Sequence, residues 1–258
     1  MLFTDHLNHS IELKGPPQRI VSLVPSQSEL LWDLGLEQRL AGVTKFCIHP
    51  RELFERIPRI GGTKTLNLEK IRALKPDLII GNKEENERSQ VEALQKEFPV
   101  WMSDIYTLDD ALKTISDIGA LTGTHGEAAN IVKGIQSSFH ELPFIDKSVL
   151  YLIWKPYMAA GRGTFIGNML AKMGLKNVIR EEGSRYPELS IEEMIALQPE
   201  LIFLSSEPFP FKQMHANELQ QLLPGTKVVL VDGELFSWYG SRLLKSVAYF
   251  HELVKQLH

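Results

Sequence analysis

Two hydrophobic patterns alternate along the first part of the chain. Short apolar, β-branched runs over 19–24, 40–43, 77–80 and 100–102 are typical of buried strands. Between them, apolar residues over 30–34 lie on one helical face that ends at Gly35, and 68–74 is expected to form a further helix. Strands that alternate with helices predict a parallel sheet with helices on its faces.

The middle of the chain has only the helical pattern. Apolar residues spaced three or four apart predict a helix over 108–121, which Gly123 interrupts. Thr124 with Glu127 forms a capping-box pattern that opens a second helix, and Pro143 ends it near Leu142. At 1.5 Å per residue this second helix would be roughly 27 Å long.

Strands and helices alternate again after Pro143. We expect strands at 149–154, 201–204 and 228–231, and helices at 165–173, 191–197 and 243–257. The chain therefore divides into an N-terminal α/β lobe (1–106), a helical segment (107–142) and a C-terminal α/β lobe (143–258).

One segment of the first lobe is repeated in the second. Residues 67–81 read NLEKIRALKPDLIIG and residues 190–204 read SIEEMIALQPELIFL, with Glu69 opposite Glu192 and Pro76 opposite Pro199. Any unit made of a helix, a proline and a strand can look like this, and a duplicated lobe is the alternative. The long helix midway between the copies favours duplication, because it supplies the connector that two lobes need.

Composition narrows the class of protein. The formal net charge is -4 and no basic run stands out, so there is no electrostatic footprint for nucleic acid. A single cysteine, Cys47, excludes an intrachain disulfide and a cysteine-rich zinc site. No apolar run reaches the roughly 18 residues that span a bilayer. The first residues also lack a secretory signal pattern, so a cytoplasmic protein and one whose signal was removed are both open.

Several segments, taken in order, point to a known family. Residues 17–36, 61–62, 67–80, 161–174 and 186–204 together resemble the class III substrate-binding proteins of ABC importers for ferric siderophores, haem and cobalamin. The resemblance implies two Rossmann-like α/β lobes with central parallel sheets, joined by a single long backbone helix, with ligand in the cleft between them. It also implies an N-terminal hairpin within 3–13. The partners it implies are the importer's membrane subunits, with Glu69 and Glu192 as one docking glutamate per lobe.

The loops that follow strands hold the candidate ligand-binding residues of the first lobe. Cys47 and His49 can face one cavity if their loop is extended, and thiolate and imidazole suit Zn, Cu or Fe. A buried cysteine and a hydrogen-bonded histidine are the alternative. His49 stands where the cobalamin binders carry a cleft tyrosine, a departure from their pattern. Glu85 lies in a charged run that could meet a cationic ligand or simply start a helix.

The second lobe offers arginines and aromatic side chains instead of metal ligands. Aromatic faces can cover an apolar macrocycle, and guanidinium groups pair with carboxylates. We expect seven residues to converge on the cleft: Cys47, His49 and Glu85 from the first lobe, and Arg162, Trp238, Tyr239 and Arg242 from the second. This division favours a metal chelate over a bare metal ion.

The predicted function is capture of such a chelate for ABC-type uptake, with no intrinsic cofactor and no catalysis. A cytoplasmic sensor or metal-handling protein on the same scaffold is the alternative. An enzyme would need Cys47 as a nucleophile with a histidine base. The phosphate-loop, dinucleotide-binding and nucleophile-elbow patterns are all missing from the sequence.

Overall fold

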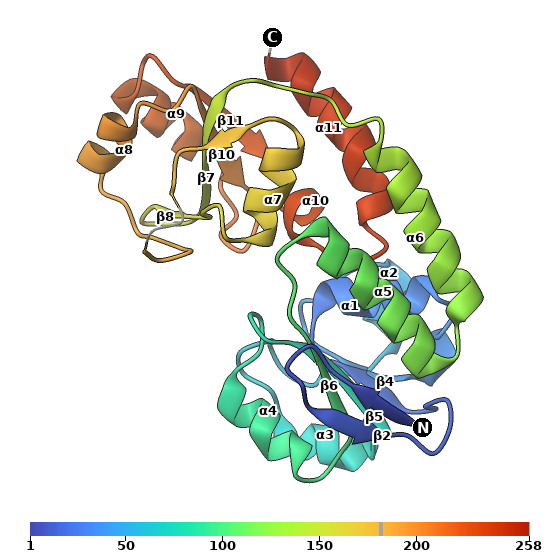
Figure 1. Ribbon diagram of the computed structural model, residues 1–258. Helices are drawn as coiled ribbons and strands as arrows, with labels where there is room; N and C mark the ends of the chain where they lie inside the picture. Colours follow the sequence, from blue (N-terminus) through green and yellow to red (C-terminus); the bar gives the residue numbers. More distant parts are fainter. Residues whose placement is uncertain (181–182, 258) are drawn as a thin grey trace. The chain divides into compact units, whose positions relative to one another are not determined.

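The computed structural model describes residues 1–180 and 183–257, which form two compact units (Figure 1). Unit 1 comprises Met1–Ile105, Asp109–Gln136 and Tyr239–Leu244. Unit 2 comprises Tyr106–Leu108, Ser137–Trp238 and the C-terminal residues from Lys245. The segment Tyr239–Leu244, which the sequence placed in the second lobe, therefore belongs to unit 1.

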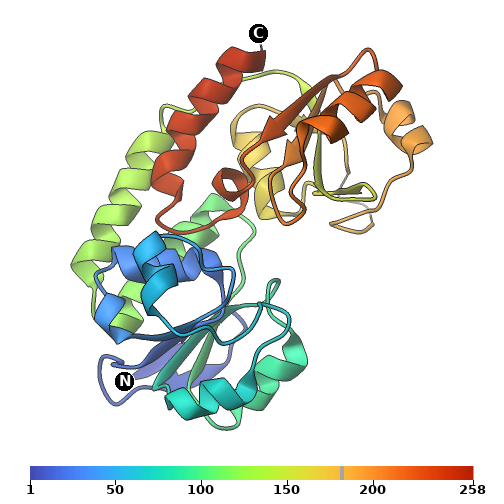
Figure 2. The same ribbon diagram turned by 180° about the vertical axis from the view of Figure 1, so that it is seen from behind.

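A four-stranded parallel sheet forms the centre of unit 1, in the order β4–β3–β5–β6. Its strands are β3 (Ile20–Ser22), β4 (Leu40–Val43), β5 (Leu78–Asn82) and β6 (Val100–Ser103). Helices α3 (Leu68–Leu74) and α4 (Arg88–Gln95) cover one face, and α1 (Pro25–Asp33) covers the other (Figures 1 and 2). The crossover rule requires this arrangement, because the chain reverses its direction across the sheet after β4.

Unit 1 has further elements around this sheet. They are the antiparallel hairpin β1 (Leu2–Thr4) and β2 (Ser10–Glu12), the 3-10 turn η1 (Glu37–Arg39), α2 (Arg51–Arg56), most of α5 (Leu108–Thr122) and the first part of α6 (His125–Phe139). The boundary between the units falls inside α6, between Gln136 and Ser137. This is the helix that the capping-box pattern predicted. The chain also crosses the boundary after Trp238 and after Leu244, so α6 is not the only crossing.

Unit 2 has its own sheet, built around β7 (Ser148–Trp154). β10 (Leu201–Ser205) and β11 (Lys227–Val231) follow in parallel on one side, while β9 (Lys176–Asn177) and the antiparallel β8 (Met158–Ala159) pair with the other side of β7. The helices are α7 (Phe165–Lys172), α8 (Ile191–Leu197), α9 (Gln213–Leu222), α10 (Glu234–Ser237) and α11 (Leu243–Leu257). The two central sheets are separate, which confirms the predicted fold class.

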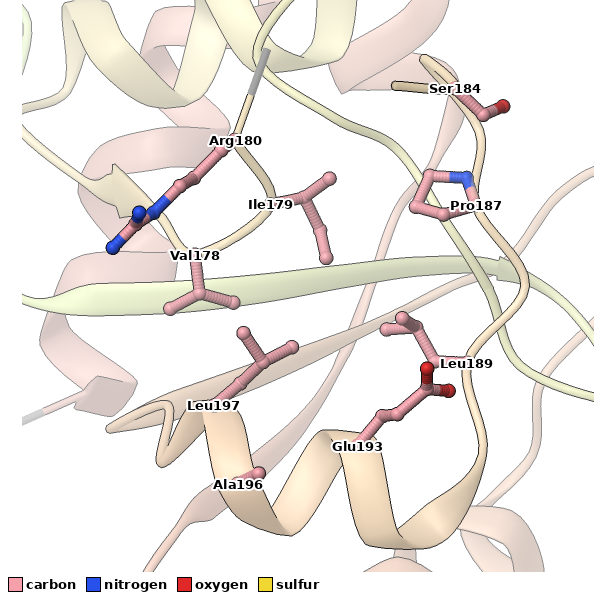
Figure 3. Close-up of a pocket in the computed structure, with 9 residues that line it drawn as sticks. All are labelled: Val178, Ile179, Arg180, Ser184, Pro187, Leu189, Glu193, Ala196 and Leu197. Carbon is pink, nitrogen blue, oxygen red and sulfur yellow. The ribbon is translucent and has the colours of Figure 1, made fainter. Parts of the chain in front are cut away.

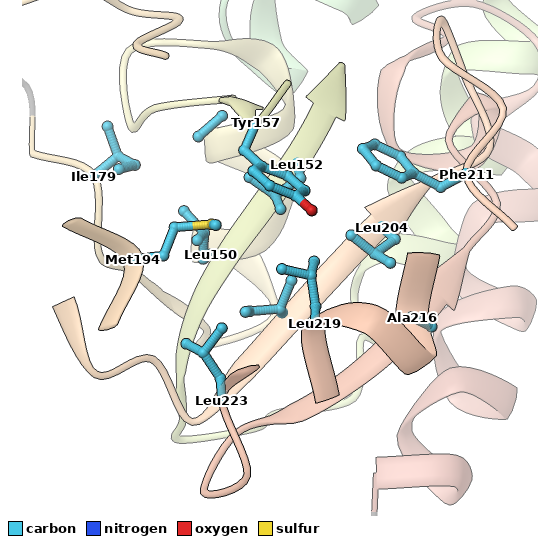
Figure 4. Close-up of a cluster of buried hydrophobic side chains, with 12 residues drawn as sticks. Leu150, Leu152, Tyr157, Ile179, Met194, Leu204, Phe211, Ala216, Leu219 and Leu223 are labelled. Carbon is cyan, nitrogen blue, oxygen red and sulfur yellow. The ribbon is translucent and has the colours of Figure 1, made fainter. Parts of the chain in front are cut away.

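The core of unit 2 follows from the alternation of side chains along its strands. Leu150 and Leu204 point toward α8 and α9 and pack there against Met194 and Leu219 (Figure 4). Residues at the intervening positions face the other way, where the rings of Tyr151 and Phe236 lie 5.2 Å apart. Both faces of the sheet are apolar because helices cover both.

The repeated segment has the same local structure in both units. Asn67 and Ser190 each cap their helix by accepting a hydrogen bond from the backbone N–H three residues later. Lys75 and Gln198 end the helices in the left-handed conformation, with φ of 47° and 44°. A proline and a buried strand follow each time. Among the described residues, no helix has both the length and the apolar composition to cross a membrane.

Candidate ligand-binding site

The carboxyl ends of the parallel strands form one edge of each sheet, which we call the carboxyl edge. Ligands of open α/β sheets bind at this edge. In unit 1 it carries the start of α1, the loop 44–50 after β4 and the loop 83–87 after β5. In unit 2 it carries the residues after β7, β10 and β11.

Cys47 points into unit 1. Its side chain is fully buried, and its Sγ lies 3.1 Å from Ser28 Oγ and 3.2 Å from Thr44 Oγ1. Burial raises the pKa of this thiol, although the two hydroxyl contacts oppose the effect. The backbone N–H of Cys47 donates to the Thr44 carbonyl over 3.2 Å, so the loop is turned rather than extended. A shared metal cavity for Cys47 and His49 required an extended loop, and the structure does not provide one.

The residues on either side of Cys47 face solvent instead. Phe46 is 49% exposed and Ile48 is 46% exposed, and His49 is partly exposed. The Lys45 ammonium lies 5.0 Å from the centre of the Phe46 ring. Among residues 1–180 and 183–257, no three His, Cys, Asp or Glu side chains are grouped so that they could hold a metal ion. Loop 44–50 therefore offers no metal site among the described residues, and it exposes the apolar side chains of Phe46 and Ile48.

Glu85 lies in the loop after β5, and the last residue of that strand, Asn82, holds the loop in place. The Asn82 side-chain carbonyl accepts hydrogen bonds from the backbone N–H groups of Glu84 and Glu85, over 2.8 and 3.2 Å. The Tyr239 hydroxyl then donates to Glu85 Oε1 over 2.5 Å. Burial raises the pKa of the Tyr239 phenol well above its ordinary value, and the Glu85 carboxylate raises it further. Tyr239 therefore stays a neutral donor to this carboxylate.

Arg242 also pairs with a residue of unit 1. Its Nε and Nη2 donate to the two carboxylate oxygens of Glu29 over 2.7 and 2.9 Å, and both side chains are less than a tenth exposed. Gly240 allows this segment to reach α1, since a Cβ there would lie 3.0 Å from the Ser26 carbonyl oxygen. Tyr239 and Arg242 were expected on the second lobe. The structure instead makes both part of unit 1, and Arg242 there compensates a buried carboxylate.

Trp238 and Arg162 belong to unit 2. Trp238 is 7% exposed, and its Nε1 donates to Glu207 Oε1 over 2.8 Å. Arg162 is exposed, and its Nε donates to the Asn177 carbonyl over 2.9 Å. Asn177 pairs with Val149, near the start of β7, so the Arg162 guanidinium lies away from the carboxyl end of that strand. The antiparallel β8, which the sequence did not predict, turns the chain back and causes this placement.

Glu207 follows β10 and is the partner of Trp238. Its Oε1 also accepts from Ser237 Oγ over 2.7 Å. Burial raises the pKa of the Glu207 carboxyl, and the nearby Glu234 and Asp232 carboxylates raise it further, although the two donors oppose the shift. The Ser237 hydroxyl and the Trp238 indole N–H, which hold this group, are both neutral donors.

An aromatic surface lies at the carboxyl edge of unit 2. Trp154, the last residue of β7, is 45% exposed, and its ring lies 6.0 Å from the ring of Phe209, which follows β10. Phe209 also lies 5.5 Å from the His215 ring, and the adjacent Met214 is 69% exposed. Phe209 was not predicted from the sequence as a site residue. Its signal was the Pro-Phe-Pro-Phe run at 208–211, which shows neither strand nor helix periodicity.

The two predicted docking glutamates are exposed, one in each unit. Glu69 lies in the first turn of α3, where its side chain is 84% exposed and ion-paired with Arg72. Glu192 lies at the matching position of α8 and is also exposed. Exposure of both side chains satisfies one requirement of a docking role.

Comparisons with known proteins agree with this architecture. The chain matches the family described as periplasmic binding protein over residues 20–226. It is 25% identical to a vitamin B12-binding protein of Pectobacterium atrosepticum over 240 residues, covering 88% of this chain and 85% of that protein. It is 24% identical to an uncharacterized ABC transporter substrate-binding lipoprotein of Bacillus subtilis over 261 residues, covering 94% of this chain and 82% of the other.

Solved structures of two Vibrio cholerae proteins have the same fold. The periplasmic vitamin B12-binding protein BtuF aligns with a TM-score of 0.77 and 24% identity, covering 93% of this chain and 98% of that one. The periplasmic haem-binding protein HutB aligns with a TM-score of 0.76 and 24% identity, covering 92% of this chain and 98% of that one. Because the family match spans most of the chain, this protein belongs to the periplasmic binding protein family.

Proposed function

We propose that this chain is the substrate-binding component of an ABC importer and captures a metal chelate of the cobalamin or haem class. The exposed apolar side chains at both carboxyl edges carry this proposal. Phe46 and Ile48 lie on unit 1, and Trp154 lies beside Phe209 on unit 2. Such groups bind the apolar faces of a macrocycle, which brings its own ligands for the metal. The relatives named for vitamin B12 and haem support the same class.

The polar residues near these surfaces have a supporting role. The Tyr239 hydroxyl holds Glu85 at the edge of unit 1, and Glu207 holds the Trp238 indole in unit 2. Each bond fixes a loop next to an exposed aromatic or apolar residue. A preformed surface loses less conformational entropy when the ligand binds.

Calorimetry with cobalamin, haem, a ferric siderophore and free Zn²⁺ tests this proposal. We expect one of the two macrocycles to bind, and Trp154→Ala to weaken that binding by about tenfold, as a buried aromatic contact should. Phe144→Ala is the matched control, because Phe144 is 75% exposed but precedes the amino end of β7. Binding of the siderophore or of Zn²⁺ alone, or equal effects of the two substitutions, would contradict the proposal.

We propose further that the protein works without catalysis. The only cysteine is fully buried and its thiol pKa is raised, so the thiolate that a nucleophile needs is disfavoured. A thiol-specific reagent should label Cys47 in the native protein much more slowly than in urea. Rapid labelling of the folded protein at neutral pH would argue for a reactive thiol.

The proposed site of action is outside the cytoplasm, where the family's substrates are captured. The match to the periplasmic binding protein family and the relative named as a lipoprotein support this location. Fractionation of cells that express the complete gene should place the protein with the membrane or the extracytoplasmic fraction. Recovery with cytoplasmic markers would favour a sensor or metal-handling protein instead.

Docking to the importer's membrane subunits is assigned to Glu69 and Glu192. Both carboxylates are exposed, and they occupy matched positions of the repeated segment. Charge reversal of both residues should weaken binding to the importer while leaving ligand affinity unchanged.

A further inference from the structure

The repeated helices α3 and α8 differ at one position that affects their glutamates. Aligning Asn67 with Ser190 places Arg72 opposite Ile195. Both positions lie one helical turn after the glutamate, at a spacing where side chains touch. In α3 the residue is a cation, and in α8 it is an apolar side chain that is 48% exposed.

Arg72 already forms an ion pair with the Glu69 carboxylate. It pairs with Glu69 and, through Nη2, with Glu97 Oε1 over 2.7 Å. The hydrogen bonds to Glu97 and Glu69 raise the pKa of the Arg72 guanidinium, so it stays charged. An incoming cation must share Glu69 with Arg72 or displace it, which reduces the gain from docking there.

Glu192 differs in this respect from Glu69. Among the described residues, no basic side chain forms an ion pair with its carboxylate. Hydrogen bonds from its own backbone N–H and from the Ser190 hydroxyl lower the pKa of the Glu192 carboxyl, so it is ionised at neutral pH. This exposed charge is complementary to a cationic partner.

Two hollows with mixed polar and apolar lining lie beside α8. One, of about 390 Å³, lies between α8 and the stretches 178–180 and 184–189 (Figure 3), and its lining includes Ile179, Leu189 and Leu197 together with Arg180 and Glu193. The other, of about 310 Å³, is lined in part by Ile195, Leu222 and Leu223. Ile195 and Leu222 are 48% and 44% exposed, so this face combines an exposed carboxylate with exposed apolar side chains.

We infer that the two docking faces are unequal and that the α8 face makes the stronger contact with the importer's membrane subunits. The inference rests on the docking role proposed above. The partner presents a basic side chain to Glu192 and an adjacent apolar side chain to Ile195 and the hollows. On α3 the position that matches Ile195 holds Arg72, which competes for Glu69. Burial of apolar surface adds affinity on α8 that α3 lacks.

Binding of the protein to the importer of the same genome, held in lipid nanodiscs, tests this inequality. We expect Glu192→Gln to weaken binding about tenfold and Glu69→Gln by about threefold or less. Glu252→Gln is the control, since Glu252 is an exposed, ion-paired glutamate on α11. Each variant should keep the ligand affinity and melting temperature of the wild type.

Exchanging the residues at the differing position gives the sharpest test. Ile195→Arg should pair with Glu192 and reduce the effect of Glu192→Gln to that of Glu69→Gln in the wild type. Arg72→Ile should increase the effect of Glu69→Gln. Equal effects of the two glutamate substitutions, or no change after either exchange, would overturn the inequality. If the wild type fails to bind the nanodiscs, or charge reversal of both glutamates leaves binding intact, docking through these residues is itself wrong.

Discussion

Two carboxylates, one buried in unit 1 and one partly buried in unit 2, are stabilised in opposite ways. Glu29 on α1 is matched by the guanidinium of Arg242 through two hydrogen bonds. Glu207 after β10 accepts hydrogen bonds from two neutral donors, the Ser237 hydroxyl and the Trp238 indole. The first group is held as an ion pair, whereas the pKa of the second is raised by burial and by neighbouring carboxylates.

The difference shows what each carboxylate requires from its partner. A buried charge matched by a bidentate guanidinium costs little while both members are present, but removing one member leaves the other without compensation. A carboxyl held by neutral donors can bind a proton, so its contribution to stability depends on pH. The stability of unit 1 should therefore depend on an intact ion pair, and the stability of unit 2 should depend on pH.

The largest expected effect comes from breaking the pair in unit 1. Arg242→Met removes the guanidinium that pairs with the buried Glu29 carboxylate, so it should lower the free energy of unfolding of unit 1 by about 3–5 kcal/mol. Urea unfolding followed by the fluorescence of a variant that keeps Trp101 as its single tryptophan reports this, because Trp101 is buried in β6 of unit 1. Adding Glu29→Gln should recover part of the loss.

Arg51→Met is the matched control for that experiment. Arg51 pairs with Glu55, but the two side chains are 87% and 57% exposed, so the change should cost less than about 1 kcal/mol. Equal losses from Arg242→Met and Arg51→Met would mean that burial does not distinguish the two pairs.

A smaller effect is expected at the neutral donor of unit 1. Tyr239→Phe removes the hydroxyl that donates to Glu85, and should lower the free energy of unfolding by about 1–2 kcal/mol. Glu85→Gln retains an acceptor oxygen and should cost less. Spectroscopic pH titration gives an independent measurement, since the raised pKa predicts that Tyr239 ionises well above an ordinary tyrosine. A normal phenol titration would contradict the buried hydrogen bond.

The local hydrophobic pattern and the capping residues were enough to predict most of the helices and strands. The helices Leu68–Leu74, Ile191–Leu197 and Leu243–Leu257 begin and end where apolar periodicity and capping residues predicted. The left-handed ends at Lys75 and Gln198 were not expected, because neither residue is glycine. Their helices are followed at once by a buried proline and strand, and that tertiary context sets the turn.

The candidate site was harder to predict because it depends on contacts between distant residues. Glu29 and Arg242 are 213 positions apart, and sequence order gave no sign that Tyr239–Leu244 returns to unit 1. The direction of Cys47 follows from the turn hydrogen bonds of its loop and from the contacts of its sulfur with Ser28 and Thr44. Phe209 joins Trp154 only because β7 and β10 are neighbours in the sheet. Each of these follows from packing that no local pattern encodes.

The smallest expected effect is at Glu207, and it should change with pH. Its folded-state pKa is raised, so the folded protein binds this proton more tightly than the unfolded chain does. The stability it contributes is therefore fully present below the unfolded pKa, near 4.5, and is lost as pH rises through the folded-state value. Glu207→Gln removes the titration while keeping an acceptor for Trp238, so at pH 7 it should raise the free energy of unfolding of unit 2 by about 0.5–1 kcal/mol.

Glu207→Ala separates charge from hydrogen bonding at the same position. It removes the acceptor as well, and should destabilise unit 2 at every pH because the buried Trp238 indole N–H loses its partner. Thermal unfolding from pH 4 to pH 8 distinguishes the variants, and the advantage of Glu207→Gln over the wild type should shrink toward zero at the acidic end. A gain that is the same at all pH values would show that Glu207 does not titrate differently in the folded protein. The contrast with the charge-compensated Glu29 would then rest on geometry alone.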